Sequence, residues 1–256
     1  MTLIKNLKKT INNILYYTLG LKIVNQKYRD INNKLNFIKR LFDNKEKLII
    51  FDVGQNIGEV SDFFLKIFDE KNIVEYEIHG FEPDKKLFEH LTKKYAKNNK
   101  IILNNLALSK PDNVGEKVFY NYEDNQKNSL NKIEENYLKY VEQTKVKVDT
   151  LNTYCKKKNI KKINFLKIDA EGEEPNILLG SDELINNNQI NYIYTELTTG
   201  NYYDKKSLRI IDIESKLNKN YKLIGIDTMN IRSEIFHADK NNSITMGLIY
   251  ANYSNN

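Results

Sequence analysis

The stretch from Ile163 to Ser181, INFLKIDAEGEEPNILLGS, decides the fold of this chain. It predicts a buried strand over Ile163–Ile168, which stops at the polar turn Asp169-Ala170-Glu171-Gly172. An amphipathic helix is expected to start directly after that turn. Carboxylates and a glycine at the carboxyl end of a strand occupy the place where open α/β sheets bind ligands. The stretch therefore predicts a functional crevice along one edge of a sheet.

Strands and helices alternate over most of the chain around this junction. A similar junction, LIIFDVGQNIGEVSDFFLKIF, lies upstream over Leu48–Phe68. Strands are expected at residues 48–53, 77–81, 101–108, 117–122, 146–151, 163–168, 191–197, 221–226 and 244–250, helices at 58–68, 84–96, 175–184 and 204–217, and a polar insert at 123–145. This alternation predicts a mostly parallel sheet with helices on both faces. The last two strands have no helix between them, so we expect them to pair as an antiparallel edge.

Length and composition are those of one globular domain with an extension. The chain has 256 residues, of which 40% are hydrophobic, and with only 3 Pro and 10 Gly no flexible linker divides it. We expect a helical extension over residues 1–45 and the α/β domain over residues 46–256. Apolar residues at helical spacing with lysines between them predict a basic amphipathic helix in the extension, followed by a second helix at residues 28–42. Such a helix contacts a membrane surface, covers the substrate site or, most commonly, packs on the main domain.

Charge and cysteine content restrict the class of protein. The net charge of +6, from 40 basic and 34 acidic residues, is mild, whereas nucleic-acid binders usually concentrate their charge in a patch. The run Lys156–Lys158 is interpreted as a solvated helix end. The single cysteine, Cys155, excludes an internal disulfide and fits a reducing compartment. No apolar run approaches the ~18 residues that span a membrane, so we expect a cytoplasmic protein whose partner is a small molecule or glycan; the oligomeric state stays open.

The loop Asp52-Val53-Gly54-Gln55-Asn56-Ile57-Gly58 follows the first buried strand and opens a helix. Gly54 permits a tight turn, and Gly58 lets the helix start close to a ligand. Asn56 can adopt a left-handed conformation and so stand in for a glycine. The spacing differs from G-x-G-x-x-G, which argues against a nicotinamide dinucleotide.

Two further strand ends complete a nucleoside site. The second strand ends at Phe81-Glu82-Pro83-Asp84, where an acidic residue can accept hydrogen bonds from both ribose hydroxyls. The third runs into Asn105-Leu106-Ala107, which would lie beside an adenine ring. This order of features is the usual layout of an S-adenosylmethionine site; another nucleotide on a Rossmann-like domain is the alternative. The residues expected to hold the cofactor are Asp52, Gly54, Gln55, Asn56, Gly58, Glu82, Pro83, Asn105, Leu106, Ala107 and Asp169.

Over about residues 48–196 the chain resembles the FkbM-type methyltransferases, a family of the class I S-adenosylmethionine-dependent superfamily. The resemblance rests on FDVGQNIGEVS, HGFEPDKKLFEHL, LNNLALS, VKVDTLNTY and FLKIDAEGEEPNILLGS, of which the last is the most specific. It implies a Rossmann-like, seven-stranded, mostly parallel sheet with one antiparallel edge strand. It also implies methyl transfer to an oxygen, mostly of sugars or natural products. The N-terminal helices and the segment after Thr198 match only loosely, so we expect acceptor choice to lie there.

Acidic side chains near the crevice are the candidates for catalysis. Asp169 is expected first to bind the methionine ammonium of the cofactor and second to act as a base. Glu171 and Glu196 could reach an acceptor hydroxyl, where a general base contributes ~10²–10⁴-fold. The three carboxylates could also hold a divalent cation, Mg²⁺ or Ca²⁺. The alternative for Glu171 is a residue that favours the dipole of the next helix.

The three histidines differ in their expected surroundings. His79 is expected in the core and His90 in solvent. His237 precedes the last strand on the side where an acceptor would enter, so it is the histidine to consider as a base.

The leading hypothesis is an S-adenosylmethionine-dependent O-methyltransferase acting on a hydroxyl of a sugar, a glycan or a small metabolite. The basic balance favours an RNA methyltransferase as the second hypothesis, but Glu196 stands where ribose-methylating enzymes tend to place a lysine. No Asn-Pro-Pro-Tyr-like string follows the Lys167-Ile168-Asp169 strand, which argues against amine methylation. A non-catalytic scaffold that binds the cofactor is the third hypothesis.

Overall fold

The computed structural model describes residues 38, 40–42, 46–133, 135, 138–203, 206–231 and 244–254. The chain forms two compact units, Met1–Asp43 and Asn44–Asn256. The strands of the described residues all belong to the second unit. The predicted N-terminal helices, the membrane contact expected of them and His237 lie outside the described residues.

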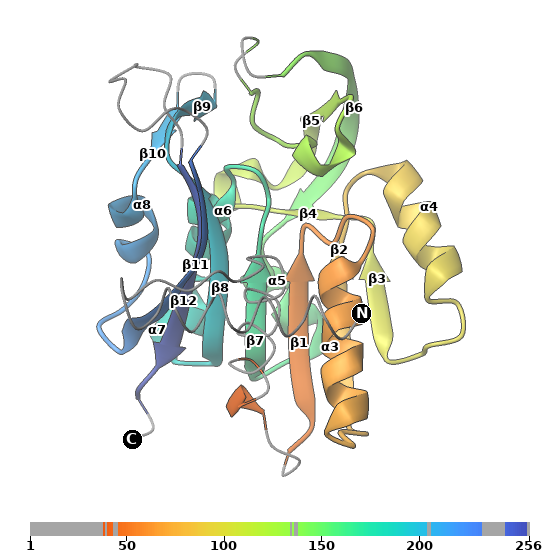
Figure 1. The fold of residues 1–256 in the computed structure, drawn as a ribbon, viewed down its shortest axis with the longest axis vertical. Coiled ribbons are helices and arrows are strands. Elements are labelled where there is room, and N and C mark those ends of the chain that lie inside the picture. The colour runs from red at the N-terminus through yellow and green to blue at the C-terminus, as the bar shows by residue number, and fades with distance from the viewer. Residues whose placement is uncertain are drawn as a thin grey trace, which may run out of the picture. The chain divides into compact units, whose positions relative to one another are not determined.

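A seven-stranded sheet forms the centre of the second unit, in the order β11-β12-β8-β7-β1-β2-β3 (Figure 1). The strands are β1 Leu48–Val53, β2 Tyr76–Phe81, β3 Ile101–Asn104, β7 Ile163–Ile168, β8 Ile190–Thr198, β11 Tyr221–Ile231 and β12 Ile244–Asn252. All six residues of β7 are buried, as expected for a parallel strand that helices cover on both faces. The strand order reverses between β1 and β7, which places a crevice at their carboxyl ends.

The last two strands pair antiparallel, as predicted. The reversed strand β12 also pairs antiparallel with β8, so it lies second from the edge and β11 forms the edge itself. The burial of the two strands differs in keeping with this order. Residues 245–250 of β12 are all buried, whereas Leu223 and Ile226 of β11 are 40% and 56% exposed.

Helices cover both faces of the sheet (Figure 1). They are α3 Glu59–Glu70, α4 Lys85–Lys94, α5 Leu151–Lys158, α6 Glu174–Leu179, α7 Asp182–Asn186 and α8 Ile210–Glu214. Phe64 of α3 packs edge-on against Phe165 of β7 on one face. Phe51 of β1 packs edge-on against Tyr154 of α5 on the other. The period of the apolar residues along each strand thus divides the core into two layers.

The helix predicted at 175–184 consists of two short helices, α6 and α7. The break falls at Gly180, where a Cβ would lie 2.1 Å from the carbonyl oxygen of Ser109. The backbone at Ser109 therefore approaches too closely for a residue with a side chain at position 180.

Two small sheets lie beyond the carboxyl ends of β1, β2 and β7 (Figure 1). The first has the order β4-β6-β5 and the second pairs β9 with β10. The strands are β4 Ala107–Leu108, β5 Gly115–Tyr122, β6 Tyr140–Asp149, β9 Gly200–Tyr203 and β10 Lys206–Leu208. The polar insert predicted at residues 123–145 joins β5 to β6 and includes the first residues of β6.

Two sequence predictions are wrong in this region. The single strand predicted at 101–108 is two strands, β3 and β4, which belong to different sheets. The helix predicted at 204–217 contains strand β10 and is helical over Ile210–Glu214. Buried apolar side chains such as Leu208 fit either element, because they satisfy a helical spacing as well as an alternation.

Among the described residues, no helix is both long enough and apolar enough to cross a membrane. His79 is buried against Tyr154 and His90 is exposed, both as predicted. Burial lowers the pKa of His79 to about 4, so this imidazole is neutral in the core. Cys155 is also buried, and burial raises the pKa of its thiol to about 12, so we assign it to packing.

Candidate active site

The glycine loop after β1 allows the carboxyl ends of β1 and β7 to approach each other closely. Gly54 has a φ of +72°, and a Cβ on it would lie 1.8 Å from the carbonyl oxygen of Asp169. Gly58 has a φ of +84° and precedes α3 as its N-cap. Asn56, with a φ of +50°, takes the left-handed conformation predicted for it. The loop therefore folds tightly over the carboxyl ends of β1 and β7.

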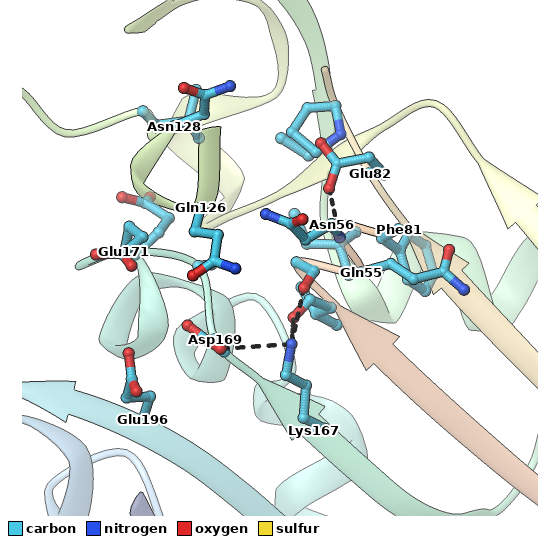
Figure 2. Close-up of a pocket in the computed structure, with 18 of the residues that line it drawn as sticks. Gln55, Asn56, Phe81, Glu82, Gln126, Asn128, Lys167, Asp169, Glu171 and Glu196 are labelled. Carbon is cyan, nitrogen blue, oxygen red and sulfur yellow. Dashed lines mark hydrogen bonds and ion pairs between the residues drawn. The ribbon is translucent and has the colours of Figure 1, made fainter. Parts of the chain in front are cut away.

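Glu82 is held rigidly at the carboxyl end of β2. Its Oε2 accepts a hydrogen bond of 2.8 Å from the backbone N–H of Asn56, and its Oε1 accepts one of 2.8 Å from Asp84. Burial raises the pKa of Glu82 to about 7, because the two backbone donors only partly offset the loss of water. The carboxylate lines the pocket (Figure 2) with lone pairs left for a ligand.

Asp52, which was predicted to bind the cofactor, does not line the pocket. It is fully buried beneath the pocket rather than in its wall. Its Oδ2 accepts a hydrogen bond of 2.8 Å from Ser61, and its Oδ1 lies 3.3 Å from the ammonium of Lys167. Lys167 also donates to the carbonyl oxygen of Gly54 at 2.7 Å. The pair thus supports the glycine loop from below.

The other predicted cofactor residues are divided between the pocket wall and its supports. Gln55, Asn56, Pro83, Leu106, Ala107 and Asp169 line the pocket. Asn105 lies beside it and donates to the carbonyl oxygens of Glu82 and Pro83 at 2.9 Å and 3.0 Å. It therefore braces the end of β2 instead of forming the predicted wall.

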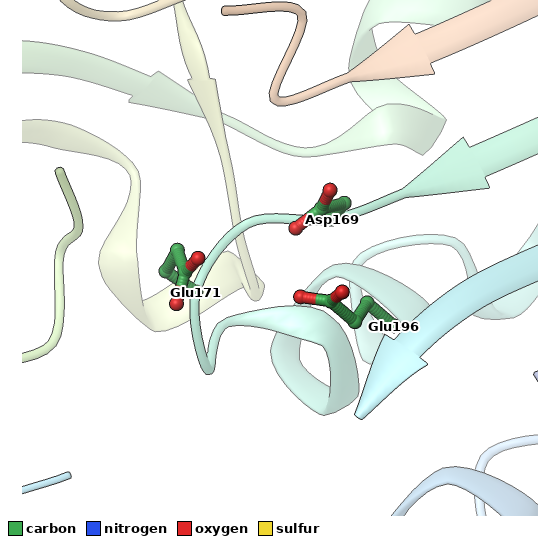
Figure 3. A group of neighbouring side chains, drawn as sticks. All are labelled: Asp169, Glu171 and Glu196. Carbon is green, nitrogen blue, oxygen red and sulfur yellow. The ribbon is translucent and has the colours of Figure 1, made fainter. Parts of the chain in front are cut away.

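Asp169, Glu171 and Glu196 form a carboxylate cluster, in which one oxygen from each lies within 4.8 Å of the others. Asp169 and Glu171 stand in the turn after β7, and Glu196 is near the end of β8 (Figure 3). Asp169 lies 3.7 Å from the ammonium of Lys167. Glu171 accepts from the ammonium of Lys127, and from the hydroxyl of Tyr203 at 3.2 Å. Two of the three carboxylates therefore have a lysine partner.

Glu196 differs from the other two members. Within the part of the chain that the structure describes, its carboxylate has no hydrogen bond or ion pair to a cation. Burial, followed by repulsion from Asp169 and Glu171, raises its pKa to about 9. Burial also raises the pKa of Glu171, and the ammonium of Lys127 opposes that rise. The Glu196 carboxyl is therefore mostly protonated near neutral pH.

The cluster by itself does not define a metal site. The predicted divalent cation would need carboxylate oxygens without other partners. Both oxygens of Glu171 already accept hydrogen bonds, and the positive charge near the cluster is supplied by Lys127 and Lys167. Glu171 has a φ of +50° in the turn before α6. Its carboxylate bonds Lys127 and Tyr203, so the alternative of a helix-start residue does not describe it.

Sequence reasoning missed Lys127 and Tyr203, and it gave Glu173 no role. Glu173 is buried and accepts from Ser109 at 2.5 Å, from Asn176 at 2.8 Å, and from Asn131 at 3.0 Å. It thereby joins α6 to the insert. No local signal marks these residues, because their partners are distant in sequence; Lys127 and Glu171 are 44 residues apart.

Residues 52–229 match the model of the methyltransferase FkbM domain. The chain belongs to the FkbM methyltransferase family. The search of curated proteins found no match to this chain.

Comparison with solved structures gave matches of low sequence identity, each with a TM-score below 0.5. The methyltransferase FkbM from Methylobacillus flagellatus is 15% identical, with 80% of this chain and 44% of that chain covered and a TM-score of 0.44. The FkbM chain described here thus spans less than half the length of that relative. An rRNA methylase from Streptococcus thermophilus is 9% identical, with 87% and 96% covered and a TM-score of 0.45. A Streptococcus mutans protein solved in complex with SAH is 9% identical, with 89% and 99% covered and a TM-score of 0.44.

Proposed function

We propose that this FkbM-family chain is an S-adenosylmethionine-dependent O-methyltransferase that acts on a hydroxyl of a sugar, a glycan or a small metabolite. When bound, S-adenosylmethionine supplies a methyl group on a positively charged sulfonium. The observation that carries the proposal is a single pocket that joins Glu82, a rigidly held buried carboxylate, to the carboxylate cluster (Figure 2). The part of the pocket around Glu82 suits a nucleoside, and the part around the carboxylate cluster suits a proton transfer.

The residues of the pocket fit the cofactor. The side-chain Oδ1 of Asn56 is buried without a hydrogen-bond partner in the described part of the chain, and a buried polar atom of this kind calls for a ligand. Glu82 would accept hydrogen bonds from the ribose hydroxyls, and Leu106 and Ala107 would lie along the adenine ring. Asp169 would bind the methionine ammonium, which completes the set of contacts.

Glu196 is the base in this proposal. Asp169 and Glu171 each lie beside a lysine ammonium, whereas Glu196 has no such partner among the described residues. A base with a raised pKa accepts a hydroxyl proton more readily once it is ionised. Because Glu196 lines the same pocket, it can meet an acceptor that enters above the cofactor.

The lining of the pocket favours a neutral acceptor rich in hydroxyls. The side chains of Gln126 and Asn128 lie across the pocket from Asn56 (Figure 2). Amide groups donate to and accept from hydroxyls equally well. The carboxylate cluster would repel the phosphates of RNA, so the RNA methyltransferase ranks below the O-methyltransferase of sugars or metabolites.

Methyl-labelled S-adenosylmethionine, incubated with the protein and an extract of its source, tests the proposal directly. The extract is afterwards fractionated into glycan, lipid, RNA, protein and small metabolites. We expect label in the glycan or metabolite fraction, and loss of that label in Asp169→Ala with the far-UV circular dichroism unchanged. Label in RNA would instead support the RNA methyltransferase. Intact cofactor binding with no labelled fraction would support the scaffold.

Cofactor affinity is expected to depend on pH through Glu82. Because its pKa is raised to about 7, the carboxylate that ribose hydroxyls prefer is lost as the pH falls below this value. Affinity for S-adenosylhomocysteine, measured by calorimetry, should then fall about tenfold for each further pH unit. In Glu82→Gln the affinity should be lower and this dependence absent. The assignment fails if Glu82→Gln binds as tightly as the wild type across the range.

A further inference from the structure

Lys127 is a pocket residue that the fold brings in from the polar insert. It ends the short 3₁₀ helix η2, Asn125–Lys127, between β5 and β6. The η2 segment, defined here as residues 125–128, lines the pocket opposite the strand ends. Figure 2 shows Gln126 and Asn128 of this segment above Asp169 and Lys167. A lysine from outside the main sheet therefore lies in the pocket beside the carboxylate cluster.

Contacts to the ends of β1, β2 and β7 hold the η2 segment in place. Asn56, after β1, donates to the carbonyl oxygen of Asn125 at 3.5 Å. Asn128 donates to the carboxylate of Asp84, after β2, at 3.3 Å. Lys127 itself bonds Glu171, after β7. Because these anchors are independent of each other, the segment does not rely on Lys127 alone for its position.

The ammonium of Lys127 has donors left for a ligand. Its hydrogen bond to Glu171 uses one of three N–H groups, and within the described residues no second acceptor bonds it. The side chain is 17% exposed, against 5% for that of Glu171, and it faces the pocket. Burial alone would lower the pKa of Lys127, but the Glu171 carboxylate offsets this and raises it. Lys127 is therefore a charged donor and not a base.

We propose that Lys127 is a further catalytic residue of the methyl transfer, whose ammonium donates a hydrogen bond to the oxygen of the acceptor hydroxyl. The inference rests on the proposed function and adds a residue to it. As the new O–C bond forms, the S–C bond breaks and its electron pair stays on sulfur. The hydroxyl proton passes to the Glu196 carboxylate. Lys127 stabilises the negative charge that grows on the oxygen before the methyl group arrives.

The choice of an ammonium donor follows from the cluster around it. Three carboxylates alone would raise the energy of a nearby oxygen that becomes negative. A cation held by Glu171 reverses that effect locally, and it also places the acceptor oxygen near Glu196. The carboxylates would repel an acceptor oxygen that becomes negative, whereas the ammonium of Lys127 would attract it. We therefore expect the acceptor hydroxyl to face Lys127.

Lys127→Met, Lys127→Arg and the control Lys145→Met test this role. Lys145 lies on β6 of the same insert, where its side chain is 74% exposed. The acceptor is the fraction labelled by the wild-type protein, and kcat, KM and the dissociation constant of S-adenosylmethionine are measured in each variant. We expect Lys127→Met to lower kcat about 100-fold, with cofactor affinity within about twofold. Lys127→Arg should recover part of the rate, since it keeps a charged donor. Lys145→Met should equal the wild type.

Three other results would overturn the inference, and they can be told apart. Equal rates in Lys127→Met and wild type would remove Lys127 from catalysis and leave the proposed function intact. A parallel loss of kcat and cofactor affinity, without recovery in Lys127→Arg, would show a residue that only supports the η2 segment. If the wild type labels no fraction, the proposed function fails and takes this inference with it.

Discussion

Replacing Lys167 by methionine is expected to lower the free energy of unfolding by about 3–5 kcal/mol, the cost of leaving a buried charge without its partner. Lys167 is 4% exposed and Asp52 is 0% exposed. Their charged atoms lie 3.3 Å apart, and the Oδ1 atom of Asp52 has no other hydrogen bond among the described residues. Methionine fills most of the lysine volume, so the loss reports the charge rather than a cavity. Urea unfolding followed by circular dichroism measures it.

A second substitution separates this electrostatic cause from packing. Adding Asp52→Asn to Lys167→Met removes the orphaned charge, so the double variant should be more stable than Lys167→Met alone. The control Lys157→Met breaks the ion pair of an exposed lysine with Asp149, in which the side chains are 67% and 15% exposed. It should change stability by less than about 1 kcal/mol. If Lys167→Met unfolds at the same urea concentration as this control, the buried pair is not a support of the glycine loop.

Replacing Glu196 by glutamine should produce the largest loss of turnover. The amide keeps the shape of the side chain but cannot accept the hydroxyl proton, so kcat on the labelled fraction should fall ~10²–10⁴-fold. The affinity for S-adenosylhomocysteine should be nearly unchanged, because Glu82 and Asn56 bind elsewhere in the pocket. Glu142→Gln, on exposed β6, is the matched control and should retain the wild-type rate. A Glu196→Gln variant with undiminished kcat would assign the proton to another group.

The pH profile gives an independent test of the same base. The pKa of Glu196 is raised to about 9, and the ionised form is the one that accepts a proton. The wild-type rate should therefore rise with pH through the neutral range and level off once Glu196 is ionised. Glu196→Gln should lose that rise, while Glu142→Gln should keep it. A flat wild-type profile would argue against a titrating base of this kind.

Much of the geometry of the glycine loop and of Glu82 follows from local sequence. Gly54 and Asn56 both have the positive φ that the loop pattern predicts, because backbone sterics act over a few residues. The placement of Glu82 at the end of β2 follows from the length of an apolar strand. The same reasoning placed Asp169 in the pocket. These features depend on residues close in the chain, so a short stretch carries enough information.

Local patterns were insufficient to predict the structure where a segment suits both a helix and a strand, or where the partner of a side chain is distant in sequence. The apolar spacing over 204–217 suits a helix, yet residues 206–208 form β10 because they pair with β9. Asp52 has the sequence position of a ligand contact, yet in the structure it is buried beside the ammonium of Lys167 and does not line the pocket. In each case the outcome depends on a partner that the local pattern does not specify.

The sequence by itself determined where the seven strands of the central sheet lie along the chain, the glycine loop, the acidic residue after β2 and the turn after β7, because each reflects short-range sterics and periodic burial. Only the tertiary structure decided which carboxylate is left without a lysine. Lys127 reaches Glu171 across 44 residues and Lys167 lies between Asp52 and Asp169. Charge interactions in a buried site depend on distance and burial, which exist only once the chain is folded.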